Sequence, residues 1–313
     1  MIRQYLQLQQ IASLQQGMVQ YLLLLYKAFR FMKKIHFLSF LLLFLLSTSA
    51  ISQNVICSAQ DKEAFEIKIK QISKFEIENI GATMVAIGKT FLDTPYVAKT
   101  LELGKTESLV INLHELDCTT FVENVLAFTL VKRSDSTSFN QFVKYIETIR
   151  YKNGILNGYP SRLHYFTEWI VNNQLKGIVT DITGEIGGKV ISKEINFMST
   201  HRDLYPFLKN NDANLDKIKE SENDLNNQEF CILPQNEIAA NEHLINSGDI
   251  IALTTSIKGL DITHTGIASR EKDGRIHLLH ASTSGAVKVS EVPLVDYLKG
   301  IKNNTGIMVV RVK

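Results

Sequence analysis

The segment LHELDCTTFVENVLAFTL, residues 113 to 130, places an acidic residue and a cysteine, Asp117 and Cys118, directly before an apolar run. The apolar side chains recur at intervals of three and four residues, which predicts a helix that buries one face. An aspartate just before such a run is a signal for the start of a helix. We therefore expect a helix from Asp117 or Cys118 to about Val131, with the cysteine in its first turn.

Other segments of the first half show the same period, and each ends at Pro, Gly or Asn. They predict further helices over residues 61–92, 139–150 and 162–173.

From Asp249 onward the apolar runs are short and are bounded by Gly, Asp and Ser, which is typical of strands. The pair Asp273-Gly274 indicates a β-hairpin. Helices followed by an antiparallel sheet predict an α+β domain, and the polar run over residues 209–229 is interpreted as a surface insertion. The strands are expected at residues 249–254, 264–269, 276–281, 287–290 and 306–312.

The start of the chain has the order of a secretory signal: Met32-Lys33-Lys34, an apolar run over residues 37–46, then small residues up to Ala50. The run is shorter than the roughly 20 residues that span a membrane. We interpret residues 32–51 as a cleaved signal peptide, which predicts a secreted or periplasmic protein without a membrane span after cleavage. Residues 1–31 are interpreted as a non-native upstream extension, and residues 52–313 as one domain.

The positive charge of the chain lies in this leader. Five of the 34 Lys and Arg residues fall within residues 1–50, which hold no Asp or Glu, so the remainder carries 29 basic and 32 acidic residues. No basic stripe is left to bind nucleic acid, and that class of partner is excluded.

The chain has three cysteines, and in an oxidising compartment an odd number leaves one thiol unpaired. We expect Cys118 to be the free one, with pairing of Cys57 and Cys231 left open. The N–H groups and dipole of a helix start stabilise a thiolate, so this position predicts a lowered thiol pKa. The alternative is a buried cysteine that packs like a small apolar side chain.

A reactive thiolate requires an imidazole, and the imidazole requires a third group to orient it. His264 begins one expected strand and His280 lies near the end of the next. With Asp273 and Gly274 as the turn residues His264 would face Thr283, whereas a bulge or a longer loop would bring His280 opposite or diagonal to it. The alternative for each histidine alone is an ordinary, partly buried side chain.

Seven segments together resemble the NlpC-type papain-like cell-wall peptidases, and more narrowly their N-acetylmuramoyl-L-alanine amidase-like branch. The wider likeness lies in TPYVAKTLE (94–102), LDCTTFVENVLA (116–127), SGDIIAL (247–253), THTGIA (263–268) and LLHASTSGAV (278–287), and the narrower one in DCTTFVEN with RYKNG (150–154) and YPSRLHYFTEW (159–169).

This resemblance implies a papain-like fold and a cysteine amidase without a cofactor or a metal, acting on peptidoglycan fragments. It implies that Cys118 is the nucleophile, His264 the general base and acid, and His280 the orienting residue. Tyr96 would complete an oxyanion site with the backbone N–H of Cys118. Arg162 and His164 would lie at the substrate pocket, the alternative for both being a solvated helix start.

The bond implied is the amide between N-acetylmuramic acid and L-alanine of the stem peptide. Three alternatives remain open. The first is an endopeptidase that cuts within the stem, between D-glutamate and the third residue. The second is a zinc amidase with Cys118, His264 and His280 as ligands, and the third is a non-catalytic module that binds the cell wall.

Overall fold

The computed structural model describes residues 55–76 and 79–313, together with isolated positions between 17 and 32. The chain divides into residues 1–53 and 54–313, and the fold and the candidate site both belong to the second part. The expected signal peptide lies outside the described residues except for Met32. Among the described residues, no helix is both long and apolar enough to cross a bilayer.

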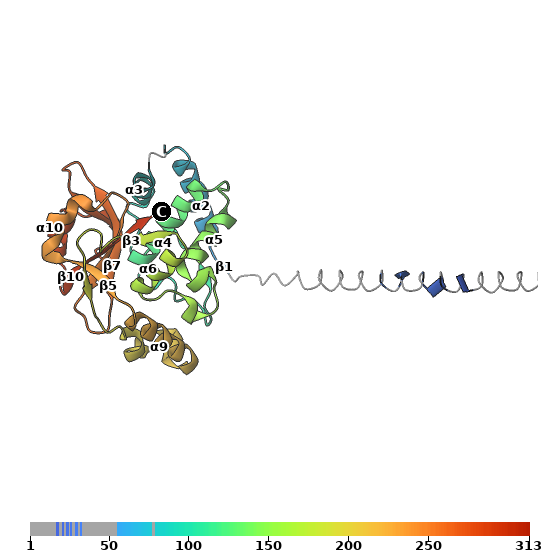
Figure 1. Ribbon diagram of the computed structural model, residues 1–313. Helices are drawn as coiled ribbons and strands as arrows, with labels where there is room; N and C mark the ends of the chain where they lie inside the picture. The colour runs from blue at the N-terminus through green and yellow to red at the C-terminus, as the bar shows by residue number, and fades with distance from the viewer. Residues whose placement is uncertain are drawn as a thin grey trace, which may run out of the picture. The chain divides into compact units, whose positions relative to one another are not determined.

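Most of the helices lie in the amino-terminal part of this chain and most of the strands in the carboxyl-terminal part, as Figure 1 shows. The amino-terminal helices pack together on one side, and the strands of the carboxyl-terminal half form a sheet on the other. The helices are α2 (Ala59–Ile72), α3 (Ile80–Lys89), α4 (Cys118–Arg133), α5 (Phe139–Arg150), α6 (Phe166–Leu175), α7 (Phe197–Thr200), α8 (Pro206–Lys209), α9 (Asp212–Asn226), α10 (Ile238–Asn241) and α11 (Leu294–Lys299).

The main sheet is antiparallel, and its strands follow the order β4-β5-β10-β6-β7-β8-β9, with β3 paired to one end of β10. A small parallel pair, β1 with β2, lies apart from it. The α+β class is therefore confirmed. The strands are β1 (Val55–Ile56), β2 (Leu109–Val110), β3 (Val179–Asp181), β4 (Lys189–Ile191), β5 (Phe230–Pro234), β6 (Ile250–Thr255), β7 (Ile262–Arg270), β8 (Ile276–Ala281), β9 (Val287–Val289) and β10 (Asn304–Val312).

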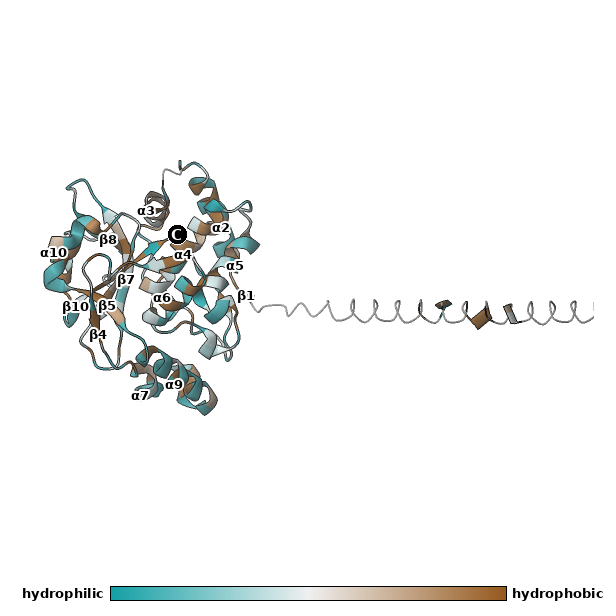
Figure 2. Ribbon diagram, viewed as in Figure 1, coloured by the Kyte–Doolittle hydropathy of each residue, from teal (hydrophilic) through white to brown (hydrophobic). Residues whose placement is uncertain are grey.

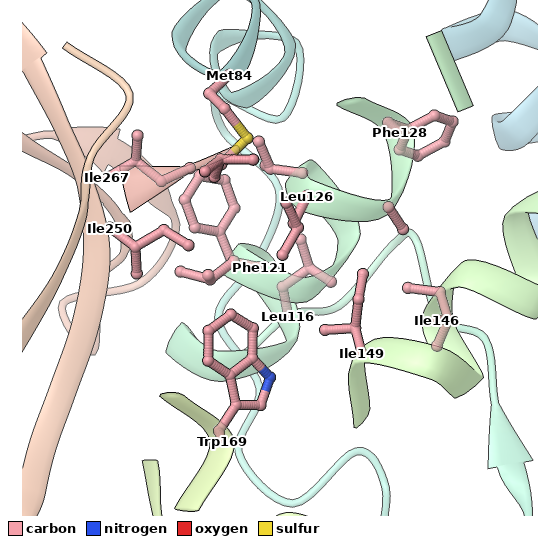
Figure 3. Close-up of a cluster of buried hydrophobic side chains, with 14 of the residues drawn as sticks. Met84, Leu116, Phe121, Leu126, Phe128, Ile146, Ile149, Trp169, Ile250 and Ile267 are labelled. Atoms are coloured by element: carbon pink, nitrogen blue, oxygen red, sulfur yellow. The ribbon is translucent and has the colours of Figure 1, made fainter. Parts of the chain in front are cut away.

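Helix α4 lies at the centre of the core. Figure 3 shows Phe121 and Leu126 of this helix in one cluster with Ile250 and Ile267 of the sheet and Trp169 of α6. All five side chains are fully buried, and each contributes roughly 1.5–3 kcal/mol by leaving water. In Figure 2 the apolar colour accordingly gathers on the inner faces of helices and strands. The core therefore holds α4 rigidly against β7.

Two helix predictions were wrong in their bounds. The helix expected over residues 61–92 is two helices, because α3 has a start of its own where the Asn79 side chain accepts a hydrogen bond from the Ala82 N–H. The helix expected from Arg162 begins only at Phe166, because Arg162 is held in extended backbone by a bridge to Tyr151. The Leu163 N–H donates to the Arg150 carbonyl in the same extended stretch.

The polar run over residues 209–229 contains helix α9, which the sequence pattern did not predict. Its few apolar side chains, Leu215, Ile218 and Leu225, are buried on one face. Ile218 and Leu225 form a small separate core with Tyr165 and Met198, so this insertion is an ordered part of the molecule (Figure 1).

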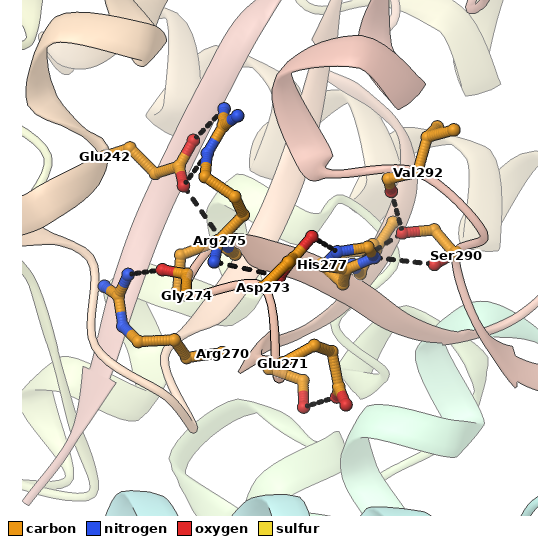
Figure 4. Close-up of polar contacts among 12 residues, drawn as sticks. Glu242, Arg270, Glu271, Asp273, Gly274, Arg275, His277, Ser290 and Val292 are labelled. Atoms are coloured by element: carbon orange, nitrogen blue, oxygen red, sulfur yellow. Dashed lines mark hydrogen bonds and ion pairs between the residues drawn. The ribbon is translucent and has the colours of Figure 1, made fainter.

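The β7–β8 hairpin turns through three residues, Lys272 to Gly274, because the Glu271 N–H donates to the Arg275 carbonyl. Gly274 takes a φ of 79°, as the last residue of such a loop requires. Figure 4 shows the polar contacts of this loop, including that of Asp273 with His277. Ile267 pairs with Leu279, so the numbers of two facing residues sum to 546. A two-residue turn at Asp273 and Gly274 would give a sum of 547. The pairing of His264 with Thr283, expected for a two-residue turn, is therefore not found, and the alternative of a longer loop with His280 diagonal to His264 is confirmed.

Candidate active site

Cys118 is the first residue of α4, and Asp117 caps the helix. The Asp117 carboxylate accepts a hydrogen bond from the Thr120 N–H at 2.8 Å, and the Thr120 hydroxyl accepts one from the Asp117 N–H at 2.9 Å. The Asp117 carbonyl accepts from the Phe121 N–H. The N–H groups of Cys118 and Thr119, which have no intrahelical acceptor in a first turn, therefore remain available at the helix start.

A cavity of about 160 Å³ opens beside this helix start. Cys118 of α4, His264 and Thr265 of β7, and His164 from the stretch before α6 all line it. Tyr205, directly before α8, also lines this cavity. The structure thus brings together a thiol and two imidazoles from segments that are far apart in the sequence. Among the hydrogen bonds of the described residues, none joins Cys118 to His264, which is common before substrate draws such groups together.

His264 and His280 are in direct contact. Nε2 of His264 lies 2.6 Å from Nδ1 of His280, and the two rings meet edge to face with centroids 4.8 Å apart. Because His280 faces position 266 in the hairpin register, it is the diagonal neighbour of His264 on the same face of the sheet. This contact leaves Nδ1 of His264 as the ring nitrogen available to the thiol.

Both imidazoles are held neutral. Burial lowers the pKa of His264 to about 4. Burial, followed by the charge of His264, lowers the pKa of His280 to about 3. The ion pairs of the described residues give neither ring a carboxylate partner that would stabilise its cation, so near neutral pH both rings are uncharged.

The expected lowering of the thiol pKa was wrong. Burial and then the Asp117 carboxylate raise the pKa of the Cys118 thiol to about 11, and hydrogen bonds from Thr265 and Thr119 oppose the rise only in part. The start of a helix favours an anion, but the desolvation of a thiolate here costs more. The resting pair is therefore a neutral thiol and a neutral imidazole.

Tyr96 lies close to Cys118. The Tyr96 backbone forms a β-bridge to Leu116, just before α4, and the Tyr96 N–H donates to the Gly285 carbonyl at 2.8 Å. Burial, and then the charges of Cys118 and Asp117, raise the pKa of the Tyr96 phenol to about 12. The phenol therefore keeps its proton near neutral pH, but Tyr96 is not among the residues that line the cavity with Cys118.

The two residues of the S-R-L-H segment have different surroundings. His164 lines the cavity, its Nε2 lies 2.9 Å from the Tyr159 carbonyl oxygen, and burial lowers its pKa well below the ordinary value. Arg162 is buried, forms an ion pair with Glu102, and has its Nε 3.5 Å from a carboxylate oxygen of Glu107. It does not line the cavity with Cys118.

Three residues at this site were not predicted from the sequence. Thr265 lines the cavity beside Cys118, and its place directly after His264 in a strand was the only available signal. Tyr297 of α11 lies edge-on to His280, with ring centroids 5.3 Å apart. Asp261 lines the cavity and accepts hydrogen bonds from the N–H and hydroxyl of Thr167, both at 2.9 Å. No local pattern marks the last two.

Cys118 is a free thiol, and so are Cys57 and Cys231, which do not pair. Among the described residues, no group of three or more His, Cys, Asp or Glu side chains is placed to hold a metal ion.

Residues 86–307 of the 313 match the AmiA-like family, described as N-acetylmuramoyl-L-alanine amidase-like. The chain belongs to this family. Family membership supports an amidase-like hydrolase that acts on peptidoglycan. No curated protein matches the chain.

Solved structures agree with this family. An N-acetylmuramoyl-L-alanine amidase from Bacteroides uniformis is 43% identical, with a TM-score of 0.71 over 75% of this chain and 99% of that one. A protein from Bacteroides fragilis, named as a candidate xylanase, is 42% identical, with a TM-score of 0.68 over 72% and 98%. A protein from Legionella pneumophila, 21% identical with a TM-score of 0.60 over 80% and 95%, shares the fold.

Proposed function

We propose that this amidase-like protein is a cysteine hydrolase that cuts the amide between N-acetylmuramic acid and L-alanine, with Cys118 as its nucleophile. One observation carries the proposal. A free thiol at the start of α4 lines the same small cavity as a neutral imidazole, and a second imidazole is in contact with the first.

The reaction begins from the neutral pair. As the Cys118 sulfur attacks the amide carbonyl, Nδ1 of His264 takes the thiol proton, so no free thiolate has to persist in the buried site. His264 becomes a cation only in this step. We assign its Nε2–H as the donor to Nδ1 of His280, which fixes the tautomer of His264 and stabilises the cation.

The tetrahedral oxyanion forms at the start of α4. The free N–H groups of Cys118 and Thr119 and the positive end of the helix favour it there, and we propose Tyr96, whose phenol keeps its proton, as a further donor. His264 then passes its proton to the leaving nitrogen, and the C–N bond breaks. The acyl group is left as a thioester on Cys118, and water activated by His264 hydrolyses it.

The choice of bond rests on the family description, which names the amide between N-acetylmuramic acid and L-alanine. The same thiol could attack an amide within the stem peptide, between D-glutamate and the third residue.

Mass analysis of the products from defined muropeptides tests the choice of bond. We expect a free sugar carboxylate and an intact stem peptide. A shortened stem on an uncut sugar would instead establish the endopeptidase. Binding of the muropeptide without any product would establish a wall-binding module.

We further propose a papain-like, NlpC-type placement for the domain and a cleaved signal peptide over residues 32–51, with a secreted or periplasmic mature protein. The papain-like placement is supported by the order of the site residues along the chain: the cysteine at a helix start comes first, and the histidines on adjacent strands follow. Sequencing the amino terminus of the protein expressed in a bacterial host tests the second, with an expected start near Ile51 to Gln53.

A further inference from the structure

The ring of His164 is held in one orientation by its neighbours. Its Nε2 lies 2.9 Å from the Tyr159 carbonyl oxygen, and its ring packs against the Tyr159 ring with centroids 4.3 Å apart and an angle of 44° between the planes. The Tyr159 ring is itself stacked on Phe207, and the Arg162 guanidinium lies 4.9 Å from its centroid. The orientation of the imidazole is therefore set before a substrate arrives.

The contact with Tyr159 also decides which ring nitrogen of His164 carries the proton. A carbonyl oxygen can only accept a hydrogen bond, so Nε2 has to be the donor. Burial, and then the charge of Arg162, lower the pKa of His164 well below its ordinary value, so the ring is neutral and carries a single proton. With that proton on Nε2, Nδ1 has a bare lone pair and can only accept a hydrogen bond.

This Nδ1 acceptor belongs to the wall of the candidate active site. Among the hydrogen bonds of the described residues none is made by Nδ1 of His164, and the residue is partly exposed. His164 lines the cavity that also holds Cys118 and His264. Because this cavity measures only about 160 Å³, a group of the substrate that fills it lies close to each of its walls.

The rest of the lining favours a hydrogen-bond donor over an anion. In the described part of the chain no Lys or Arg side chain lines this cavity, whereas Asp261 adds a carboxyl group to it. One oxygen of that carboxyl accepts the N–H and the hydroxyl of Thr167. A carboxylate of a ligand would meet no cation at this wall, whereas an N–H group would meet an acceptor.

A secondary amide carries such a donor on the nitrogen that has to leave. In the proposed reaction the carbonyl carbon is attacked by Cys118, so the nitrogen bonded to it lies within reach of the same walls. An acceptor at His164 holds the N–H on its own side and leaves the nitrogen lone pair for the proton from His264. The C–N bond then breaks, and the nitrogen leaves as a primary amine.

We infer that Nδ1 of His164 accepts the N–H of the amide that is cut, and that His164 thereby selects secondary amides over esters. The inference rests on the proposed function and gives His164 a binding role without proton transfer. An ester has an oxygen in place of the N–H, and the lone pairs of that oxygen would face the lone pair of Nδ1. A site built to accept an N–H rejects such an analogue.

Two substrates and two variants test this role. The substrates are an N-acetylmuramoyl-L-alanyl peptide and its ester analogue, in which oxygen replaces the alanine N–H. His164→Gln keeps a donor for the Tyr159 carbonyl but has no acceptor at the δ position. His164→Asn places an amide oxygen at the δ position but does not reach that carbonyl.

We expect His164→Gln to lose about tenfold or more in kcat/KM on the amide and to change by no more than about threefold on the ester. His164→Asn should recover most of the loss on the amide. The matched control is His201→Gln, since His201 also stacks on an aromatic ring and has Nδ1 2.9 Å from a carbonyl oxygen, but is exposed and outside the cavity lining. Equal losses on both substrates, or better recovery with Gln than with Asn, would overturn the inference.

A second readout does not depend on turnover. In the full chain carrying Cys118→Ala, ¹⁵N NMR of the His164 ring should show a proton on Nε2 and a bare Nδ1. The amide substrate should shift the Nδ1 resonance, and the ester should not. If the wild type cuts neither substrate, the proposed function fails while this measurement still decides the inference. A proton on Nδ1 in the free protein, no shift with the amide, or equal shifts with both ligands would contradict it.

Discussion

Strand β8 carries two histidines with opposite protonation behaviour. His280 faces His264 and its pKa is lowered to about 3. His277, three residues earlier and therefore on the other face of the strand, has Nε2 at 3.0 Å from an Asp273 carboxylate oxygen and Nδ1 at 2.8 Å from the Ser290 carbonyl. Its pKa is raised, because these two acceptors outweigh the burial of the ring (Figure 4).

The difference lies in the partner. A carboxylate beside an imidazole stabilises the cation and would give a proton-loaded ring that cannot act as a base near neutral pH. A second neutral imidazole orients the first without charging it. The pairing of His264 with His280 therefore suits a base that has to accept a thiol proton, whereas that of His277 with Asp273 suits a structural hydrogen bond at the hairpin.

The largest effects should separate the two faces of the sheet. Cys118→Ala should lower amide hydrolysis by about 10³-fold or more, and His264→Ala by about 10²- to 10⁴-fold, because each removes a group that the attack requires. His277→Ala, the matched control, should stay within about threefold of the wild type. Steady-state kinetics on a muropeptide measures all three variants. Equal losses for His264→Ala and His277→Ala would contradict the assignment of different roles to the two faces of the sheet.

The variant His280→Asp replaces the imidazole–imidazole pair of His264 with an imidazole–carboxylate pair like that of His277. The new carboxylate should raise the pKa of His264 from about 4 by roughly 1–3 units. The acidic limb of the profile of kcat/KM against pH should move up by the same amount, and His280→Asn should not move it upward. An unmoved limb in the aspartate variant would show that His264 is not the base that titrates.

Stability should respond to acid in opposite directions on the two faces. The pKa of His264 and of His280 lies at about 4 and about 3 in the folded protein and near 6.5 when unfolded. As pH falls from about 6.5 toward 4, the unfolded chain takes up protons that the folded chain does not, so the free energy of unfolding decreases. The slope is at most about 1.4 kcal/mol per pH unit for each histidine.

Urea unfolding at several pH values measures this slope, and His280→Asn should make it shallower. The pKa of His277 is raised on folding, so its contribution is complete below its unfolded pKa and is lost as pH rises through its folded pKa. His277→Asn should therefore leave the slope between about pH 6.5 and 4 unchanged and should alter the pH dependence only above about pH 6.5. Identical slopes in both variants would contradict the assignment of the two environments.

The smallest effect is expected from Asp273→Asn. Loss of the carboxylate should lower the pKa of His277 toward its ordinary value, because the main group that stabilises its cation is gone. NMR titration of the His277 ring measures this shift, and activity should remain within about twofold of the wild type. A fall in activity well beyond twofold would mean that the contacts at the hairpin affect the reaction at the Cys118 cavity.

The spacing of apolar residues in the sequence was sufficient to predict a helix or strand wherever the structure of a segment depends on that segment alone. The helix over residues 139–150 and the strand over residues 276–281 were predicted with the bounds found for α5 and β8. The hairpin signal at Asp273-Gly274 placed His264 and His280 on neighbouring strands, although the three-residue loop changed the register.

Features that depend on distant partners could not be predicted. Arg162 lies in an extended segment because its backbone bridges to Tyr151, and its side chain pairs with Glu102 and Glu107, about 60 residues earlier in the chain. The thiol pKa follows from burial and the Asp117 charge, and a helix-start argument does not include that burial. Helix α9 is stabilised by the packing of a few apolar residues against Tyr165, in a sequence whose polarity suggested none.

Cys118 is the proposed nucleophile, and thiol alkylation in a Cys57→Ser, Cys231→Ser background tests this role most directly. Iodoacetamide is added in steps, the modified fraction of Cys118 is measured by mass spectrometry, and the residual muropeptide hydrolysis is measured in the same samples. We predict that activity falls one for one with Cys118 modification and is unaffected by a metal chelator. Full activity with Cys118 fully alkylated, or loss of activity with the chelator alone, would contradict the nucleophilic role.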